Sequence, residues 1–264
     1  LPIFWVNGSW VTAYADDTMV IVEADSLDEL KSKTEEEGKC LLQFFASNQM
    51  VANASKTGLL VFRPTKQAQR SLLSVNLAGT EVTECDEDRV LGVIVNNELK
   101  WNGHISKIQN ECHYHLYVLR RLRHVLTNAQ LRTIAEGIIM SRLRYCLPIF
   151  GSEFVRLRDT DSRSAIVGSL QLIQNDMLRI ITGKRRQDHE RISDMLTETK
   201  MLSINQLTAY SILLETWRAK TFAIPHLSSL LITGRNDERT LRSDTAGNVS
   251  ASSTEIFAMN AHLT

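Results

Sequence analysis

Long apolar runs, closely spaced cysteines and a net charge are all missing from this sequence of 264 residues. No stretch of about 20 consecutive apolar residues occurs, so a membrane-spanning helix is not expected. The four cysteines have no Cys-x-x-Cys spacing, which indicates free thiols in a reducing compartment and argues against a disulfide framework. Basic and acidic residues are equal in number, with 30 of each, so the chain as a whole is not a polycation.

The charges are unevenly distributed along the chain. Residues 1–100 contain 9 Lys and Arg against 15 Asp and Glu, whereas residues 101–200 contain 16 against 10. A nucleic-acid-binding protein needs a basic face near an acidic, metal-binding site, and it does not need a basic total. The distribution therefore permits a nucleic-acid binder whose acidic groups come from the first part and whose cations come from the second.

The most informative stretch runs from Val11 to Val22, where two β-branched runs flank the dipeptide Asp16-Asp17. These runs predict the two strands of a hairpin. Adjacent Asp residues disfavour strands and repel each other, and a hard cation with oxygen ligands would resolve this conflict. Carboxylates at a hairpin tip could hold Mg²⁺ against a polyphosphate during phosphoryl transfer. A solvated turn is the other interpretation, because Asp-Asp is an ordinary turn dipeptide.

The residues after this hairpin predict one helix packed across a sheet. Ser26 followed by Glu29 is typical of a helix start. An apolar stripe from Leu27 to Phe45 gives this helix one buried face and leaves its charged face in solvent. The first hundred residues are therefore expected to form an antiparallel sheet with one packed helix. Further strands are expected at 59–62, 74–77, 81–83 and 90–95, the last of them with a glycine inside.

Helices replace strands after residue 100. Apolar residues step by three or four from Ile105 to Leu119, which predicts an amphipathic helix, and similar patterns follow up to residue 217. Beyond Pro225 the chain has few apolar residues and many polar ones, which is typical of a flexible tail. The expected fold class is α+β. The expected parts are 1–98 with the sheet, 99–160 and 161–224 with helices, and 225–264 as the tail.

The stretch Tyr14-Ala15-Asp16-Asp17 between apolar strands resembles the catalytic hairpin of reverse transcriptases. Later phrases are similar to the reverse transcriptases of non-LTR, LINE-type retrotransposons, and their order matches that family. The resemblance covers roughly residues 10–220. It implies that 1–98 is the C-terminal part of a polymerase palm, 99–160 a helical thumb and 161–224 a helical extension. The later phrases lie at 53–57, 91–104, 141–146, 170–175, 178–183 and 201–207.

The resemblance also implies roles for the residues of the hairpin. In the complete enzyme, Asp16 and Asp17 would be catalytic carboxylates that help to hold Mg²⁺. Tyr14 and Ala15 would border the substrate at the primer end. The partners implied are an RNA template, a DNA primer and deoxynucleotides, and the family's work on genomic DNA implies the nucleus.

Two further segments match the family. Asn53 and Lys56 fit its Asn-x-x-Lys-Thr pattern, in which the lysine lies near the incoming nucleotide and is thought to protonate the pyrophosphate leaving group. Leu91-Gly92 resembles the primer grip, where the backbone approaches the primer terminus. A surface lysine in a loop and a core strand with a bulge are the alternative interpretations of these two segments.

Six cations of the helical part are candidates for contacts with nucleic-acid phosphates. Such contacts carry affinity but little sequence information. For any one of these residues an ordinary charge at a helix end is the alternative, whereas a cluster would add to one positive field. The six are Arg120, Arg121, Arg123, Lys184, Arg185 and Arg186.

One component of the family's polymerase site has no counterpart here. That site uses three carboxylates, and the first lies on a strand well upstream of the Asp-Asp pair, whereas only 13 residues precede Tyr14. We therefore expect the chain to be a fragment of an RNA-directed DNA polymerase that is inactive alone. A catalytically dead remnant that only binds RNA or DNA, and a helical interaction module, are the alternatives.

Overall fold

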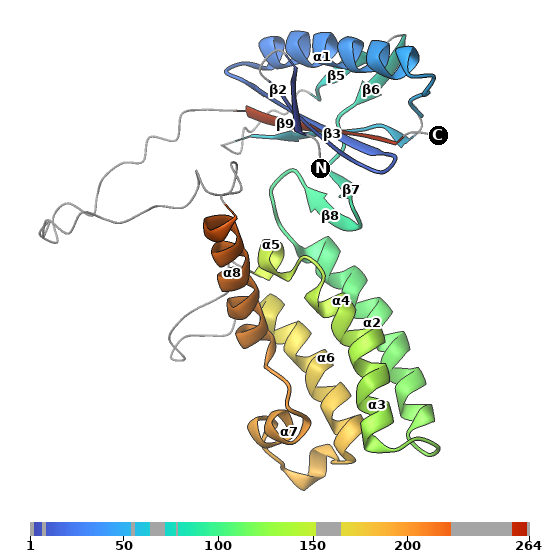
Figure 1. The fold of residues 1–264 in the computed structure, drawn as a ribbon, viewed down its shortest axis with the longest axis vertical. Coiled ribbons are helices and arrows are strands. Elements are labelled where there is room, and N and C mark those ends of the chain that lie inside the picture. Colours follow the sequence, from blue (N-terminus) through green and yellow to red (C-terminus); the bar gives the residue numbers. More distant parts are fainter. Residues whose placement is uncertain are drawn as a thin grey trace, which may run out of the picture. The chain divides into compact units, whose positions relative to one another are not determined.

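The computed structural model describes residues 3–6, 9–53, 56–63, 72–77, 79–151, 165–222 and 255–262. It divides the chain into two compact units. Unit 1 combines Leu1–Trp101 with Asp244–Thr264, and unit 2 is Asn102–Ser243. Unit 1 is built around antiparallel sheets and unit 2 around helices, so the expected α+β class is confirmed (Figure 1). Among the described helices, none combines the length and apolarity that a bilayer crossing requires.

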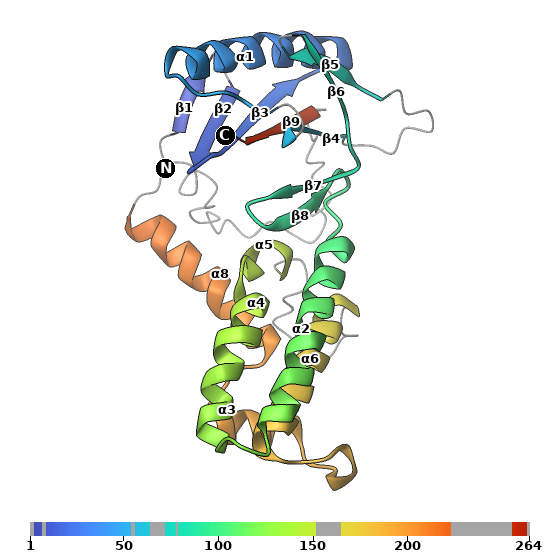
Figure 2. The same cartoon turned by 90° about the vertical axis from the view of Figure 1, so that its right-hand side faces the viewer.

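A five-stranded antiparallel sheet is the centre of unit 1, with the strand order β1-β2-β3-β9-β4. Helix α1 (Leu27–Ser47) lies across one face of this sheet (Figures 1 and 2). The helix begins as expected, because the Ser26 hydroxyl accepts a hydrogen bond from the Glu29 backbone N–H at 3.3 Å. The strands are β1 (Ile3–Val6), β2 (Ser9–Tyr14), β3 (Asp17–Ala24), β4 (Gly58–Phe62) and β9 (Glu255–His262).

Buried residues alternate with more exposed ones along β3, and the buried ones contribute to the core of unit 1. Every second residue of this strand from Thr18 to Ala24 is buried, as expected for a strand with one face against a helix. Val20 and Val22 belong to one apolar cluster with Leu30 and Phe45 of α1. Burying a side chain of this kind contributes about 1.5–3 kcal/mol, so the cluster holds β3 and its preceding turn in place.

Two hairpins complete unit 1, and one of them corrects an expectation. The continuous strand expected at 90–95 is wrong, because Leu91 and Gly92 form the two-residue turn between β7 (Glu87–Val90) and β8 (Val93–Asn96). Both turn residues have positive φ, 46° and 87°, as type I′ hairpin turns require. The sequence did not predict this turn, because it lies inside an apolar run and leucine rarely adopts a positive φ. The other hairpin pairs β5 (Ser74–Leu77) with β6 (Thr80–Thr83).

Residues 255–262 correct the expected tail of 225–264. They form β9, which pairs with β3 on one side and with β4 on the other. The strand was not predicted because its short apolar run lies among polar residues. Its pairing partners also lie about 190 residues away or more along the chain. Residues 223–254, which make up most of the expected tail, lie outside the described part of the chain.

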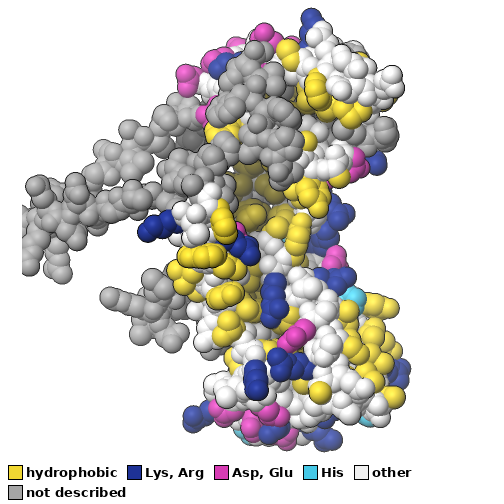
Figure 3. All heavy atoms as spheres, viewed as in Figure 1, with side chains coloured by type: hydrophobic (Ala, Val, Ile, Leu, Met, Phe, Trp, Pro, Cys, Tyr) yellow, Lys and Arg dark blue, Asp and Glu magenta, His cyan; other side chains and the backbone are white. Residues whose placement is uncertain are grey.

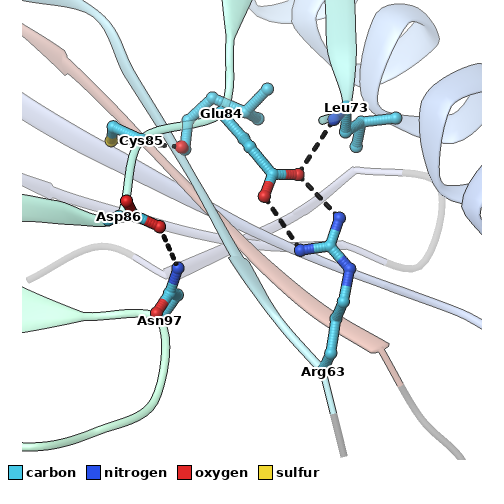
Figure 4. A network of polar contacts seen from close by, with 7 residues as sticks. Arg63, Leu73, Glu84, Cys85, Asp86 and Asn97 are labelled. Atoms are coloured by element: carbon cyan, nitrogen blue, oxygen red, sulfur yellow. Dashed lines mark hydrogen bonds and ion pairs between the residues drawn. The ribbon is translucent and has the colours of Figure 1, made fainter. Parts of the chain in front are cut away.

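A buried ion pair joins the end of β4 to the β5–β6 hairpin (Figure 4). The Arg63 guanidinium donates two hydrogen bonds to the Glu84 carboxylate, at 2.9 and 2.6 Å. The Leu73 backbone N–H donates a third hydrogen bond to the same carboxylate, at 2.9 Å. The two charged side chains are only 7% and 2% exposed, so the pair depends on these bonds to compensate its lost hydration.

Unit 2 is one helical assembly, in which α2 and α3 pack on α6, and α6 packs on α7 and α8. The expected boundary between residues 160 and 161 therefore does not separate two compact bodies. Capping boxes at Thr127 and Ser203 begin α3 and α8. The helices are α2 (Asn102–Leu122), α3 (Asn128–Ala135), a π-helical turn (Glu136–Met140), α4 (Ser141–Arg144), α5 (Leu147–Gly151), α6 (Ala165–Thr182), α7 (Ile192–Thr199) and α8 (Ile204–Thr221).

The buried carboxyl of Glu37 in α1 is expected to make the stability of unit 1 depend on pH. The residue is 5% exposed, and its Oε2 has no hydrogen-bond partner among the described residues. Burial raises the pKa of the Glu37 carboxyl, an effect that a hydrogen bond with Ser9 partly offsets. Because the folded-state pKa exceeds the unfolded one, the contribution of Glu37 to stability is full below the unfolded pKa and is lost as the pH rises through the folded pKa.

We therefore expect Glu37→Gln to stabilise unit 1 at neutral pH, by on the order of 1 kcal/mol. The gain should shrink toward zero as the pH falls below about 4, where both proteins are neutral at this position. Hydrogen exchange of the α1 amides between pH 4 and 8, corrected for intrinsic rates, measures the difference. Glu36→Gln, at the exposed neighbouring position, is the control, and an equal effect of both variants would contradict the assignment.

Candidate functional site

The tip of the β2–β3 hairpin places the Asp16-Asp17 pair. Tyr14 pairs with Asp17, so Ala15 and Asp16 form a two-residue turn. Ala15 has a φ of 54°, in the left-handed region where glycine is preferred at this type of turn. The strained residue costs on the order of 1 kcal/mol and persists because the paired strands determine its conformation. Six other described non-glycine residues also have positive φ, so the distinguishing feature of this hairpin is that its strained turn carries two adjacent carboxylates.

The side chains at this tip are open to solvent. Tyr14 is 61% exposed, Asp16 is exposed and Asp17 is partly buried at the first position of β3. Water screens the repulsion between two carboxylates that are adjacent in sequence. The tip therefore presents oxygen ligands, beside an aromatic ring, to a cation or substrate arriving from solution.

The register of the sheet brings Lys56 to the same end as this tip. Asp17 pairs with His262 of β9, and Gly58 pairs with Asn260 of the same strand. Lys56 lies in the turn two residues before Gly58, and β4 therefore begins at the same end of the sheet as β3, where Asp17 lies. The Asn53 carbonyl accepts hydrogen bonds from the Lys56 N–H and the Thr57 hydroxyl, both at 3.0 Å, and these bonds form the turn that begins β4.

The predicted metal ligands Asp16 and Asp17 fit one Mg²⁺ better than two. Mg²⁺ binds through one or two protein carboxylates and takes its other ligands from water and phosphates. Within the described ranges, no group of three His, Cys, Asp or Glu residues could hold a metal ion. A two-metal site needs further ligands, so the described residues do not form a complete one.

The segment Leu91-Gly92 lies at the tip of the β7–β8 hairpin, and Leu91 is 41% exposed. Strand β7 runs beside the start of β4, where Gly58 leaves room for the Asp88 carboxylate and any Cβ would collide with it. The structure thus joins this hairpin to the strand that follows Lys56. The predicted role of Leu91 and Gly92 near the primer stays a prediction.

Five of the six predicted cations of unit 2 line one cavity of about 490 Å³ at the C-terminal ends of α2 and α6. Arg121 is the exception, because its guanidinium contacts Tyr117, 5.5 Å from the ring centroid. Three further polar or charged residues of the lining, His124, Asp176 and Arg179, were not predicted from the sequence. Asp176, Arg179 and Gly183 are spaced by three and four residues, a helical spacing that could have indicated the first two. The lining residues are Arg120, Arg123, His124, Asp176, Arg179, Ile180, Gly183, Lys184, Arg185 and Arg186.

Several of these cations also have structural partners. Arg123 donates hydrogen bonds to the carbonyls of Arg179 and Ile180, at 3.2 and 2.9 Å, and so satisfies the last carbonyls of α6. Lys184 pairs with Glu190 at 3.2 Å, and Arg186 pairs with Asp176 at 3.0 Å. Basic and acidic side chains are accordingly mixed at the lower end of unit 2 on the face seen in Figure 3.

The cavity nevertheless keeps an excess of positive charge. Six of its lining residues are Lys or Arg, and Asp176 is its one carboxylate. The ion pairs and hydrogen bonds described above hold the side chains of Arg123, Lys184 and Arg186 in place. Arg120, in contrast, has no hydrogen-bond or ion-pair partner in the described part of the chain. A concave surface with a clear excess of cations favours phosphate groups over neutral ligands.

Comparison with protein-family models, with curated proteins and with solved structures finds no match for this chain. The assignment of a function therefore rests on the residues of the chain and their arrangement in each unit. Two features carry it: the strained carboxylate turn of unit 1 and the basic cavity of unit 2.

Proposed function

We propose that this chain is the C-terminal part of the polymerase region of a non-LTR retrotransposon reverse transcriptase, an RNA-directed DNA polymerase. The observation that carries the proposal is the strained Tyr14–Asp17 turn, which presents two carboxylates at the sheet end that Lys56 also reaches. Unit 1 is then the end of a palm, and unit 2 is a thumb with its extension.

The chemistry of these residues fits nucleotidyl transfer in the complete enzyme. Asp16 and Asp17 supply hard oxygen ligands of the kind that Mg²⁺ prefers, and Mg²⁺ neutralises charge on a polyphosphate. Lys56 carries a charge suited to a phosphate or a departing pyrophosphate. The basic cavity of unit 2 supplies sequence-independent contacts with the backbone of an RNA template or DNA primer.

A complete two-metal site needs more carboxylates than the described residues bring together. We therefore expect the chain on its own to be inactive in polymerisation. Primer extension on an RNA template with Mg²⁺ and deoxynucleotides tests this, using the chain as given and a longer form that restores its natural upstream sequence.

Only the longer form should extend the primer, and Asp16→Asn should reduce its rate by at least about 10³-fold, because a metal ligand is lost. Asp28→Asn, at an exposed acidic position at the start of α1, is the matched control and should leave the rate unchanged. Extension by the chain as given would contradict the need for a further carboxylate, and an active longer form of Asp16→Asn would remove the proposed role of the turn.

A binding protein without polymerase activity is the second candidate, because the basic cavity lies in unit 2 and does not involve the carboxylate turn. Its test is duplex binding at several salt concentrations. This candidate predicts binding that survives Asp16→Asn combined with Asp17→Asn and weakens with Arg120→Ala, while neither the chain nor its longer form extends a primer.

A further inference from the structure

A second cavity of unit 2, of about 500 Å³, lies where α6 packs on α3 and α7 (Figure 1). From α6 and α7 it is lined by the last two residues of each helix, Ile181 and Thr182 of α6 and Glu198 and Thr199 of α7. Its described lining shares no residue with that of the basic cavity. Two helix C-termini therefore meet at a separate cavity of unit 2.

The backbone at these two helix ends offers hydrogen-bond acceptors. The last four carbonyls of an α-helix have no partner within the helix and carry its negative partial charge. Within the ranges that the structure describes, no donor reaches the backbone carbonyls of the four lining residues from α6 and α7. The hydroxyls of Thr182 and Thr199 donate to carbonyls one turn earlier in their own helices, at 2.9 and 2.7 Å. The ends of α6 and α7 therefore present mainly acceptors to the cavity.

The charged side chains of the lining add a negative excess. Arg132 and Glu136 pair with each other across one turn of α3, at 3.1 Å, so their charges offset each other. Glu198 is exposed and has no hydrogen-bond or ion-pair partner among the described residues. The start of α3 adds little positive field, because a capping box between Thr127 and Gln130 satisfies two N–H groups there. The cavity is therefore matched to a cation with several hydrogen-bond donors.

Arg123 shows how this chain already satisfies one part of the same helix end. Its guanidinium donates to the carbonyls of Arg179 and Ile180, the first two of the last four carbonyls of α6, at 3.2 and 2.9 Å. The other two, of Ile181 and Thr182, belong to the second cavity. A guanidinium has five N–H donors and no acceptor, whereas an ammonium has three donors and is more strongly hydrated. A second guanidinium is therefore the cation that fits these acceptors best.

We propose that this cavity binds the guanidinium of an arginine side chain that belongs to a protein partner. Glu198 forms the ion pair, and the carbonyls at the ends of α6 and α7 accept further hydrogen bonds. Ala129 of the lining offers apolar surface to the methylene groups of the arginine. Cavities of this volume hold ligands larger than one side chain, so peptide that flanks the arginine also fits. The proposal concerns unit 2 and does not rest on the proposed polymerase function.

Titration of the isotope-labelled full chain with the tripeptide acetyl-Gly-Arg-Gly-amide, followed by amide chemical shifts, tests this site. We expect the amides of Thr182, Gly183, Thr199 and Lys200 to shift and to reach saturation. The same peptide with citrulline in place of arginine has nearly the same shape and no charge, and it should bind at least about tenfold more weakly. The lysine peptide should bind about fivefold more weakly than the arginine peptide.

Two variants at exposed positions locate the binding. Glu198→Gln should weaken binding of the arginine peptide about fivefold or more, because a neutral hydrogen bond replaces a charged one. Asp194→Asn removes the same charge from the start of α7, outside the cavity, and is the matched control. Ala129→Arg adds an arginine to the cavity lining and should abolish binding of the peptide.

Equal affinity for the arginine and citrulline peptides would overturn the proposal, as would saturating shifts elsewhere with none at the four amides. Equal weakening by Glu198→Gln and Asp194→Asn would show attraction to the net charge of unit 2 and no binding in the cavity. Methylguanidinium distinguishes the two sources of the group, because binding as tight as that of the arginine peptide would contradict a protein partner. All of these results are independent of primer extension.

Discussion

Replacing Glu84 by Gln should destabilise unit 1 by about 3–5 kcal/mol, because the Arg63 charge would remain buried without its counter-ion. The Arg63 and Glu84 side chains are 7% and 2% exposed, so water cannot take the place of the lost carboxylate. The amide would also weaken the hydrogen bond from the Leu73 backbone N–H. Native-state hydrogen exchange of the β5 and β6 amides measures the loss in unit 1 separately from unit 2.

Two further variants distinguish a buried charge from a general effect of the substitution. Glu87→Gln changes an exposed carboxylate on the neighbouring strand and should alter stability by less than about 0.5 kcal/mol. Arg63→Met combined with Glu84→Leu removes both charges and should recover part of the loss, because no unpaired charge stays buried. A double variant less stable than Glu84→Gln would contradict this account of the ion pair.

Replacing Gly183 by Ala should destabilise unit 2 by about 2–4 kcal/mol, since two costs coincide at this residue. Its φ is +83°, which side chains other than glycine rarely adopt. The Arg123 guanidinium also occupies the space of the missing Cβ, so it would move away from the carbonyls of Arg179 and Ile180. Hydrogen exchange of the α6 amides measures the effect on unit 2.

Gly168 of the same helix is the matched control. A Cβ at Gly168 meets no atom within 4 Å, and its φ is not in the left-handed region. Gly168→Ala should therefore stabilise α6 by about 0.5–1 kcal/mol, through the higher helix propensity of alanine. Destabilisation of equal size by both substitutions would show that the packing of α6, and not the contact with Arg123, determines the result.

Local signals predicted the elements that depend on local interactions. The hairpin around Asp16-Asp17 and the cap at Ser26 form where the sequence indicates, because each is held by bonds within a few residues. The turn at Leu91 was missed because leucine there goes against its own backbone preference, and only the pairing of β7 with β8 imposes it.

Features that join distant residues could not be predicted in the same way. The basic cavity depends on the packing of α2 against α6, so the charge pattern indicated its cations but not that Arg121 would lie outside it. The Arg63–Glu84 pair spans 21 residues and carries no periodic signal. Strand β9 is the extreme case, since its partners lie in residues 17–24 and 58–62.

This last separation has a consequence for synthesis on the ribosome. Strand β4 ends at Phe62 and β9 begins at Glu255, so at about 5–20 residues per second roughly 10–40 s pass between their translation. The nascent chain therefore exposes two open strand edges while all of unit 2 is still being made, and such edges promote aggregation. A chaperone that shields β3 and β4 during elongation should raise the yield of folded protein more than one that acts after release.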